Sequence, residues 1–248
     1  MTDSEFEQRA AALLAKTEYG LTDLAEIVTL LRSERGCPWD KVQTHETIRR
    51  DFLEETYEVL EAIDCASPEM LREELGDVLL QVFFHTDIER ERGTFTLDDV
   101  ADEVCKKLIL RHPHVFGDVK ADTVDKVLSN WDAIKKDEKQ QETFADTLKS
   151  VPKVFPSAMR AQKLGKRASR AGIELASADD ANELAKQLID RGETAKAMLV
   201  LANAVRLRGG DAEEELARAC DSFTERFEEL ESSGRTLTEV AAAELYDY

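Results

Sequence analysis

The hydrophobic positions of this chain repeat at intervals of three and four residues along most of its length. The run Leu21, Leu24, Ile27, Val28 and Leu31 shows this spacing. An amphipathic α-helix has this period, whereas the apolar residues of a half-buried strand alternate with polar ones. The 5 prolines and 11 glycines fall mostly between the periodic segments, where they predict loops. We therefore predict an all-α fold.

The breaks divide the chain into a series of predicted helices. These helices cover residues 20–34, 43–64, 68–92, 97–111, 123–138, 156–172, 178–206, 211–231 and 236–246. The stretch from Lys135 to Lys153 is rich in charged residues and ends in proline-bearing segments, which is typical of a domain junction. We expect two domains in tandem, 1–150 and 151–248, each built from helical hairpins like a four-helix bundle. A hydrophobic content of 42% can supply a core for each.

The net charge and the cysteines limit the partners and the compartment. A net charge of −19, from 33 basic and 52 acidic residues, argues against a nucleic-acid polymer and suits divalent cations that take oxygen ligands. The 4 cysteines form no C-x-x-C pair, which indicates neither a zinc site nor a disulfide scaffold and favours a reducing cytoplasm. The polar N-terminal segment and the lack of a long apolar run predict neither a secretory signal nor a membrane span.

Two consecutive predicted helices carry acidic residues beside an apolar stripe. Glu54, Glu55 and Glu58 follow the pattern E-E-x-x-E, and Glu74 and Asp77 form an E-x-x-D pair on the next helix. Residues three or four apart share a helical face, and the short connection at 65–68 predicts an antiparallel hairpin. The carboxylates would then converge. Their repulsion, on the order of 1 kcal/mol per pair, favours a neutralising cation, and Mg²⁺ prefers oxygen ligands.

A solvated acidic surface and a di-iron bundle are the alternatives to a Mg²⁺ site. In a chain this acidic, a pair of carboxylates on a helix is ordinarily a solvated surface. The doubled motif favours a metal site, because none of its carboxylates has a lysine four residues later to pair with. These residues alone do not decide between a metal site and a solvated acidic surface. A di-iron bundle uses E-x-x-H ligands, and neither His45 nor His85 lies three residues after a glutamate.

Further segments carry a family resemblance. Fifteen residues separate E-E-x-x-E from E-x-x-D, Gly36–His45 contains C-P-W-D-x-x-Q-T-H, Arg111–Phe116 reads R-H-P-H-V-F, and Asn130–Lys135 reads N-W-x-x-x-K. Together, over about residues 20–140, these motifs resemble the MazG family of all-α NTP pyrophosphohydrolases. The resemblance implies hydrolysis of NTPs and dNTPs to the monophosphate and pyrophosphate by a homodimer, with Mg²⁺ or, alternatively, Mn²⁺.

The resemblance also implies roles for individual residues. The implied metal ligands are Glu55, Glu58, Glu74 and Asp77. Glu54 is implied as a further metal or water-activating carboxylate, which makes Glu54, Glu55 and Glu58 the catalytic set. The implied substrate-binding residues are Lys107, Arg111, Trp131 and Lys135. The cations would contact phosphate oxygens and Trp131 would stack on a base, although Arg111 as a helix cap and Trp131 as a core residue are alternatives.

Several prominent side chains are interpreted as structural. We expect hydrogen bonds from Trp39, His45, His112 and His114 to lock their loops. We expect Cys105 and Cys220 to be buried as small apolar residues.

The second half resembles the family's second domain but lacks its ligands. The segments that carry this likeness are Ala158–Lys163, Arg170–Ile173 and Asn203–Arg206, and residues 101–111 also align with 216–226. Glu183 is followed by Lys186, and Glu193 by Lys196, where further carboxylates would be needed. We therefore expect a degenerate, structural duplicate, with the Lys196 ammonium filling part of a former cation site.

Two other functions remain alternatives to a broad NTP pyrophosphohydrolase. They are a non-catalytic helical module that senses nucleotides or binds a protein, and a narrower enzyme resembling dUTPase or dCTPase.

Overall fold

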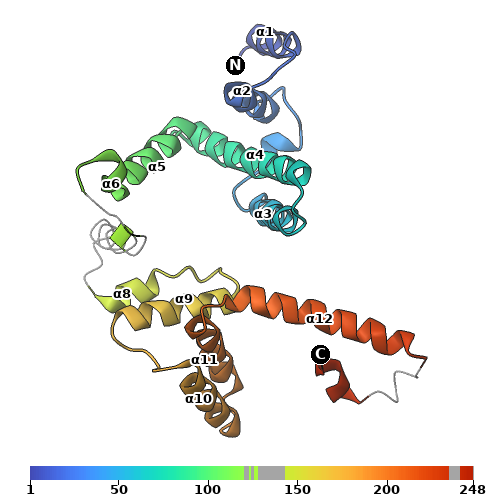
Figure 1. Ribbon diagram of the computed structural model, residues 1–248. Coiled ribbons are helices and arrows are strands. Elements are labelled where there is room, and N and C mark those ends of the chain that lie inside the picture. Colours follow the sequence, from blue (N-terminus) through green and yellow to red (C-terminus); the bar gives the residue numbers. More distant parts are fainter. Residues whose placement is uncertain (120–122, 124–125, 128–142, 235–240, 248) are drawn as a thin grey trace. The chain divides into compact units, whose positions relative to one another are not determined.

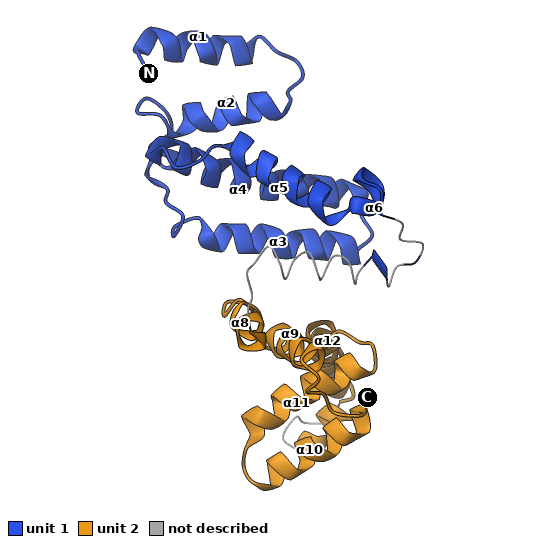
Figure 2. Ribbon diagram, turned by 90° about the vertical axis from the view of Figure 1, so that its left-hand side faces the viewer, with its two compact units in different colours: residues 1–131 blue, residues 132–248 orange. Residues whose placement is uncertain are grey.

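The computed structural model describes residues 1–119, 123, 126–127, 143–234 and 241–247. All regular secondary structure in these residues is helical, as predicted (Figure 1). The chain divides into two compact units, residues 1–131 and 132–248 (Figure 2). We predicted a boundary near residue 150. Arg167 in the second unit, however, donates a hydrogen bond to the carbonyl of Thr147, which holds the short helix around Thr147 against that unit.

The helices of the first unit follow the predicted series closely. They are α1 (Asp3–Leu14), α2 (Leu21–Arg32), η1 (Asp40–Val42), α3 (Arg49–Asp64), α4 (Pro68–Arg92), α5 (Leu97–Arg111) and α6 (Pro113–Phe116). The predictions for 68–92 and 97–111 are confirmed to the residue. Helix α3 begins later than predicted, because Thr44 and Thr47 hydrogen-bond to each other and hold a turn before it. Helix α1 was not predicted.

The second unit is also built from helices. They are α8 (Phe144–Lys149), α9 (Ser157–Arg170), α10 (Ala178–Asp190), α11 (Thr194–Leu207), α12 (Ala212–Ser232) and η3 (Ala242–Tyr246). The single helix predicted for 178–206 is wrong. Gly192 takes a left-handed conformation with φ 74°, which ends α10 and turns the chain back into α11. Most of the predicted helix 123–138 lies outside the described residues.

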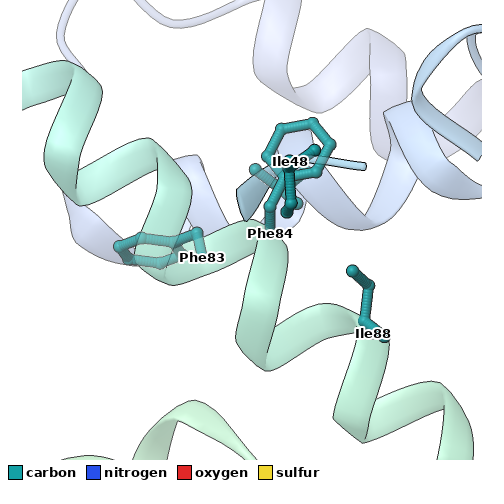
Figure 3. Packing of buried hydrophobic residues seen from close by; sticks show 5 residues of the cluster. Ile48, Phe83, Phe84 and Ile88 are labelled. Atoms are coloured by element: carbon teal, nitrogen blue, oxygen red, sulfur yellow. The ribbon is translucent and has the colours of Figure 1, made fainter. Parts of the chain in front are cut away.

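Helix α4 carries the core of the first unit on its C-terminal half. Phe83, Phe84 and Ile88 are buried on this half, against Val28 of α2 and Ile48 of the loop before α3 (Figure 3). The N-terminal half of α4 packs instead along α3. One helix of 25 residues therefore links the core to the hairpin that carries the acidic residues.

A buried guanidinium joins α2 to α4. Arg32 is 5% exposed; its Nε lies 3.1 Å from Asp87 Oδ2 and one of its Nη atoms 2.8 Å from Glu91. It also donates to the backbone carbonyls of Asp40 and Gln43, so the same side chain ties down the loop after α2. The buried charges are thus paired and hydrogen-bonded, as a charge removed from water requires.

Small residues allow the helices of the second unit to approach closely. Ala161, Ala202 and Ala212 form one buried cluster, in which α9, α11 and α12 meet. A Cβ added to Gly165 of α9 would lie 2.3 Å from Asn203 Oδ1, so only glycine fits there. In the parts of the chain that the structure describes, no helix has the length and hydrophobicity that a membrane crossing requires.

We predict that Arg32→Ala lowers the free energy of unfolding of the first unit by about 3 kcal/mol, because it leaves Asp87 buried with fewer cationic partners. Trp39 lies on the loop that Arg32 holds, so tryptophan fluorescence during urea unfolding reports on this unit. Arg35→Ala is the matched control. Arg35 is half-exposed and its pairs with Asp3 and Glu7 lie at the surface, so the loss should stay below about 1 kcal/mol. Equal losses for the two variants would contradict this assignment.

Candidate metal centre

The turn between α3 and α4 brings the acidic residues of the two helices together. Ala66 has a positive φ of 49°, which reverses the chain directly after α3. Ser67 then caps α4 by accepting a hydrogen bond from the Met70 amide, and Pro68 occupies the first helical turn, where its missing N–H costs nothing. The predicted antiparallel hairpin is therefore present.

Three carboxylates converge across this hairpin. Glu55 and Glu58 of α3 and Glu74 of α4 can each place an oxygen within 4.8 Å of the others. Glu55 and Glu74 are half-buried, whereas Glu58 is exposed. Three oxygen donors at this separation match the ligands of a hard divalent cation, and the site faces solvent on one side, from which substrate and water can approach.

The electrostatics of the cluster favour a bound cation. The pKa of Glu55 is raised to about 6, first by burial and then by the charge of Asp77 and by Glu58. The pKa of Glu74 is also raised, by burial and by Glu58, Glu73 and Asp77. Each carboxylate thus resists ionisation beside its neighbours, and a cation would relieve that cost.

Asp77 adjoins the three central carboxylates, whereas Glu54 does not join them. Asp77 is close enough to raise the pKa values of Glu55 and Glu74, which places its charge at the cluster. Glu54 instead points toward solvent, where its carboxylate accepts a hydrogen bond of 2.9 Å from Arg50 Nε.

Two of the four predicted substrate-binding residues are described. Lys107 and Arg111 lie one turn apart on α5, Lys107 exposed and Arg111 half-buried in the last turn. Among the residues that the structure describes, no ion pair joins Lys107 to the carboxylates. Trp131 and Lys135 lie outside the described residues.

The histidines of the predicted loops have different surroundings. His45 stacks on His85 with their Nδ1 atoms 2.6 Å apart, and its Nε2 donates to Glu89 at 2.6 Å, so the structural prediction for His45 is confirmed. His112 donates from Nδ1 to the Leu108 carbonyl at 2.7 Å, which also fits a structural role. His114 Nδ1 is buried and has no hydrogen-bond partner among the described residues.

Trp39 differs from the prediction. Its side chain is 61% exposed, and the hydrogen bond at this residue is made by its backbone carbonyl, which accepts from Gln43 Nε2. The loop is held by hydrogen bonds from Arg32 to its backbone carbonyls and not by the indole of Trp39. Gly36 contributes as well, because a Cβ at that position would lie 2.2 Å from the carbonyl oxygens of Leu30 and Leu31.

The polar residues on the buried half of α4 were not predicted from the sequence. Asp87 binds Arg32, Arg90 and Thr29, and Glu89 binds His45, Arg92 and Thr94. These contacts hold the pKa of Glu89 at about 2, with the Thr94 hydroxyl as the largest cause. A signal was present: Asp87 interrupts an otherwise apolar face next to Phe83, Phe84 and Ile88, where a charge requires a buried partner.

The apolar stripe beside the acidic residues is not part of the core. Leu53, Tyr57, Leu60 and Ile63 of α3 are each about half exposed, and Leu75 of α4 is 50% exposed. An apolar stripe of this kind on a helix ordinarily faces a core. The α3–α4 hairpin uses only one of its faces within the chain, so the periodicity was correct but the surface that covers the stripe is not supplied by the described part of the chain.

The prediction that the two cysteines are buried is wrong. Cys105 and Cys220 are exposed, because α5 and α12 turn those faces to solvent. Lys196 is 71% exposed and pairs at 2.5 Å with Glu193, three residues earlier on the same helical segment. The Lys196 ammonium therefore lies beside Glu193, as predicted.

The first unit is all-helical in its described residues and carries convergent carboxylates on an antiparallel hairpin, which defines the class of all-α proteins with an acidic cluster between two helices. Residues 43–116, which contain both acidic motifs, match the family described as "MazG nucleotide pyrophosphohydrolase domain". The nucleoside triphosphate pyrophosphohydrolase/pyrophosphatase MazG of Thermotoga maritima is 35% identical, over 91% of this chain and 92% of that protein.

Two further relatives extend the comparison. The nucleoside triphosphate pyrophosphohydrolase of Escherichia coli K12 is 37% identical over 84% of this chain and 86% of its own length. The uncharacterized protein YabN of Bacillus subtilis is 49% identical over 140 residues, which cover 56% of this chain but 28% of that protein. With near full-length similarity to the Thermotoga maritima protein, this chain belongs to the MazG family.

We predict that Glu55→Gln stabilises the metal-free protein at about pH 7.5 by on the order of 1 kcal/mol, because it removes a repelled carboxylate. Between the ordinary glutamate pKa and about 6, the folded state binds more protons than the unfolded state, so stability falls as pH rises through this window. Near pH 4.5 Glu55 is protonated and the gain should vanish. Urea unfolding in EDTA at the two pH values measures this difference. Glu61→Gln, an exposed residue of α3 outside the cluster, should change neither value, and a gain that persists at the lower pH would contradict the assignment.

Proposed function

We propose that the first unit hydrolyses nucleoside triphosphates to the monophosphate and pyrophosphate with the aid of Mg²⁺. The observation that carries this proposal is the convergence of Glu55, Glu58 and Glu74 on the hairpin of a MazG-family chain. The Thermotoga maritima and Escherichia coli relatives, aligned over most of their length, are named for this activity.

Glu55, Glu58, Glu74 and Asp77 are the proposed ligands. Their oxygens are hard donors, and burial together with mutual repulsion raises the pKa values of Glu55 and Glu74. The exposed side of the cluster leaves room for phosphate oxygens. When bound, Mg²⁺ acidifies water and neutralises charge on the phosphates. Mn²⁺ shares this oxygen chemistry and is the proposed substitute.

The reaction breaks one phosphoanhydride bond. The oxygen of a water molecule attacks the α-phosphorus, the bond from that phosphorus to the oxygen bridging it to the β-phosphorus breaks, and pyrophosphate leaves with the electron pair. The water loses its proton to solvent or to a carboxylate. Glu54 is the proposed acceptor, because it adjoins the cluster in sequence and its carboxylate is solvent-accessible beside Arg50.

The residues proposed to bind the substrate are cationic and aromatic. Lys107 and Arg111 share one face of α5, and we assign them to phosphate oxygens, where charge-assisted hydrogen bonds are strongest. We assign Trp131 to stacking on the base and Lys135 to a further phosphate contact.

The second half, 151–248, is proposed to serve as a structural domain, with 1–150 as the catalytic domain. In its described helices α10 and α11, no cluster of three carboxylates is present. Glu193 pairs with Lys196, and that contact lowers the pKa of Glu193. In the first unit, by contrast, the pKa values of the proposed ligands Glu55 and Glu74 are raised.

A homodimer is the proposed assembly. The stripe Leu53, Tyr57, Leu60 and Ile63 adjoins the carboxylates and is about half exposed, and α5 exposes Leu108 and Ile109 to a similar degree. An apolar surface of this kind is typical of an interface. The four cysteines are all free thiols, which supports a reducing compartment, and we propose the cytoplasm.

Glu58→Gln and Asp77→Asn should each lower turnover at least about 100-fold, because each removes a ligand charge from the proposed metal site. The assay incubates the protein with Mg²⁺ and a panel of NTPs and dNTPs and separates the products by chromatography. Glu183→Gln, on α10 of the second unit, is the control and should leave turnover unchanged. Release of orthophosphate, or turnover that survives both substitutions, would refute the proposal.

Leu60→Asp should convert the dimer to a monomer, because it places a charge in the centre of the proposed apolar interface. Light scattering coupled to size-exclusion chromatography gives the mass directly. Leu14→Asp, at an 84% exposed position of α1, controls for the added charge and should remain dimeric. A monomeric wild-type protein, or a Leu60→Asp variant that stays dimeric, would refute this interface.

A further inference from the structure

Helix α9 concentrates positive charge in an acidic protein. Its 14 residues contain five cations and no acidic residue, in a chain of net charge −19. The cations are Arg160, Lys163, Lys166, Arg167 and Arg170. At about 100° per residue, all five fall within an arc of roughly 120° on the helix.

The opposite side of α9 is fixed by packing. Ala161 is buried against α11 and α12, and Gly165 lies against Asn203 with no space for a Cβ. The helix therefore cannot rotate to hide its cations. Lys163, Lys166 and Arg170 are exposed, which leaves the centre of the charged arc open to solvent.

The two exposed lysines of this arc are not neutralised by the nearby acidic residues. Glu174 is engaged by Arg206 and Ser169, and Glu213 accepts a hydrogen bond from the Met159 amide. Within the described ranges, no carboxylate pairs with Lys163 or Lys166.

The two partly buried arginines of the arc also lack carboxylate partners in the described residues. Arg167 donates to the Thr147 carbonyl and the Ser150 hydroxyl, which are neutral acceptors, so its charge is held in place but not cancelled. Arg160 Nε is buried without a hydrogen-bond partner there. Lys163 lies 5.5 Å from the centre of the Phe155 ring, which orients its ammonium without neutralising it.

We propose that this face of α9 binds a linear polyphosphate, either inorganic tripolyphosphate or the triphosphate tail of a nucleotide, at a site separate from the carboxylates of the first unit. From Arg160 to Arg170 the helix rises about 15 Å, enough for a short chain of phosphates. Guanidinium and ammonium groups are the usual partners of phosphate oxygens. A long nucleic acid fits less well, because the rest of this acidic chain would repel it.

The site needs no metal ion, which separates it from the proposed function. In EDTA, the acidic cluster of the first unit carries only negative charge and repels phosphates, whereas the cations of α9 are unaffected. Polyphosphate binding can therefore succeed or fail independently of hydrolysis, and Glu58→Gln should bind polyphosphate as the wild type does.

Calorimetric titration of the full-length protein with sodium tripolyphosphate in EDTA tests the proposal. We expect saturable binding that weakens with salt, and at least 10-fold weaker binding by the double variant Lys163→Gln/Lys166→Gln. The control Lys186→Gln/Lys196→Gln removes two exposed lysines from α10 and α11 and should bind as the wild type does. Far-UV circular dichroism verifies that each variant is folded.

Further titrations identify the source of the phosphates. Equal binding of ATP and tripolyphosphate would show that phosphates alone are recognised, whereas tighter binding of ATP would assign the site to nucleotides; either result supports the proposal. No binding of tripolyphosphate, or equal losses in both double variants, would overturn it. So would a single-stranded oligonucleotide that binds more tightly than tripolyphosphate at about 0.15 M salt, because the face would then belong to nucleic acid.

Discussion

The buried contact between Arg32 and Asp87 is the interaction on which the first unit depends. It fixes the C-terminal half of α4 against α2, and the same guanidinium holds the loop that leads toward α3 through two backbone carbonyls. Ile48 at the end of that loop packs on Phe83 and Phe84, so α3 enters its hairpin from a fixed point. Because α4 is one continuous helix, fixing its C-terminal half also fixes the position of Glu74 and Asp77 on its N-terminal half.

This arrangement explains how the hairpin holds carboxylates that repel one another. Burial and the repulsion between neighbouring carboxylates both raise the pKa values of Glu55 and Glu74, and within the hairpin alone these costs would separate the two side chains. The buried half of α4, its contact with His45 through Glu89, and the capped turn at Ser67 supply the opposing stability. The repulsion at the carboxylates therefore lowers the stability of the folded protein locally, and a bound cation would remove that loss. Functional sites commonly lower stability in this way.

Much of this fold could be predicted from the sequence, because capping and periodicity act locally. The bounds of α4 follow from Ser67–Pro68 at one end and Gly93 at the other, and both proved correct. The carboxylate spacing likewise fixes a shared face, which the structure confirms for Glu55, Glu58 and Glu74. The Arg32–Asp87 pair, which joins residues far apart in sequence, has no periodic signal.

The exposed apolar stripe of α3 marks another limit of such prediction, since periodicity identifies an apolar face without identifying what covers it.

A comparison of the α3–α4 and α10–α11 hairpins indicates what the carboxylates require. The α10–α11 hairpin, in which no cluster of three carboxylates is present among the described residues, packs through Ala185 and Ala197, which are almost fully buried. In α3, Ala62 is the buried residue, and the hairpin with α4 brings three carboxylates together. Small residues allow two helices to approach closely, whereas carboxylates that converge between helices need space for a cation or for solvent. In the α10–α11 hairpin the Lys196 ammonium pairs with Glu193, so that carboxylate is neutralised without a bound cation.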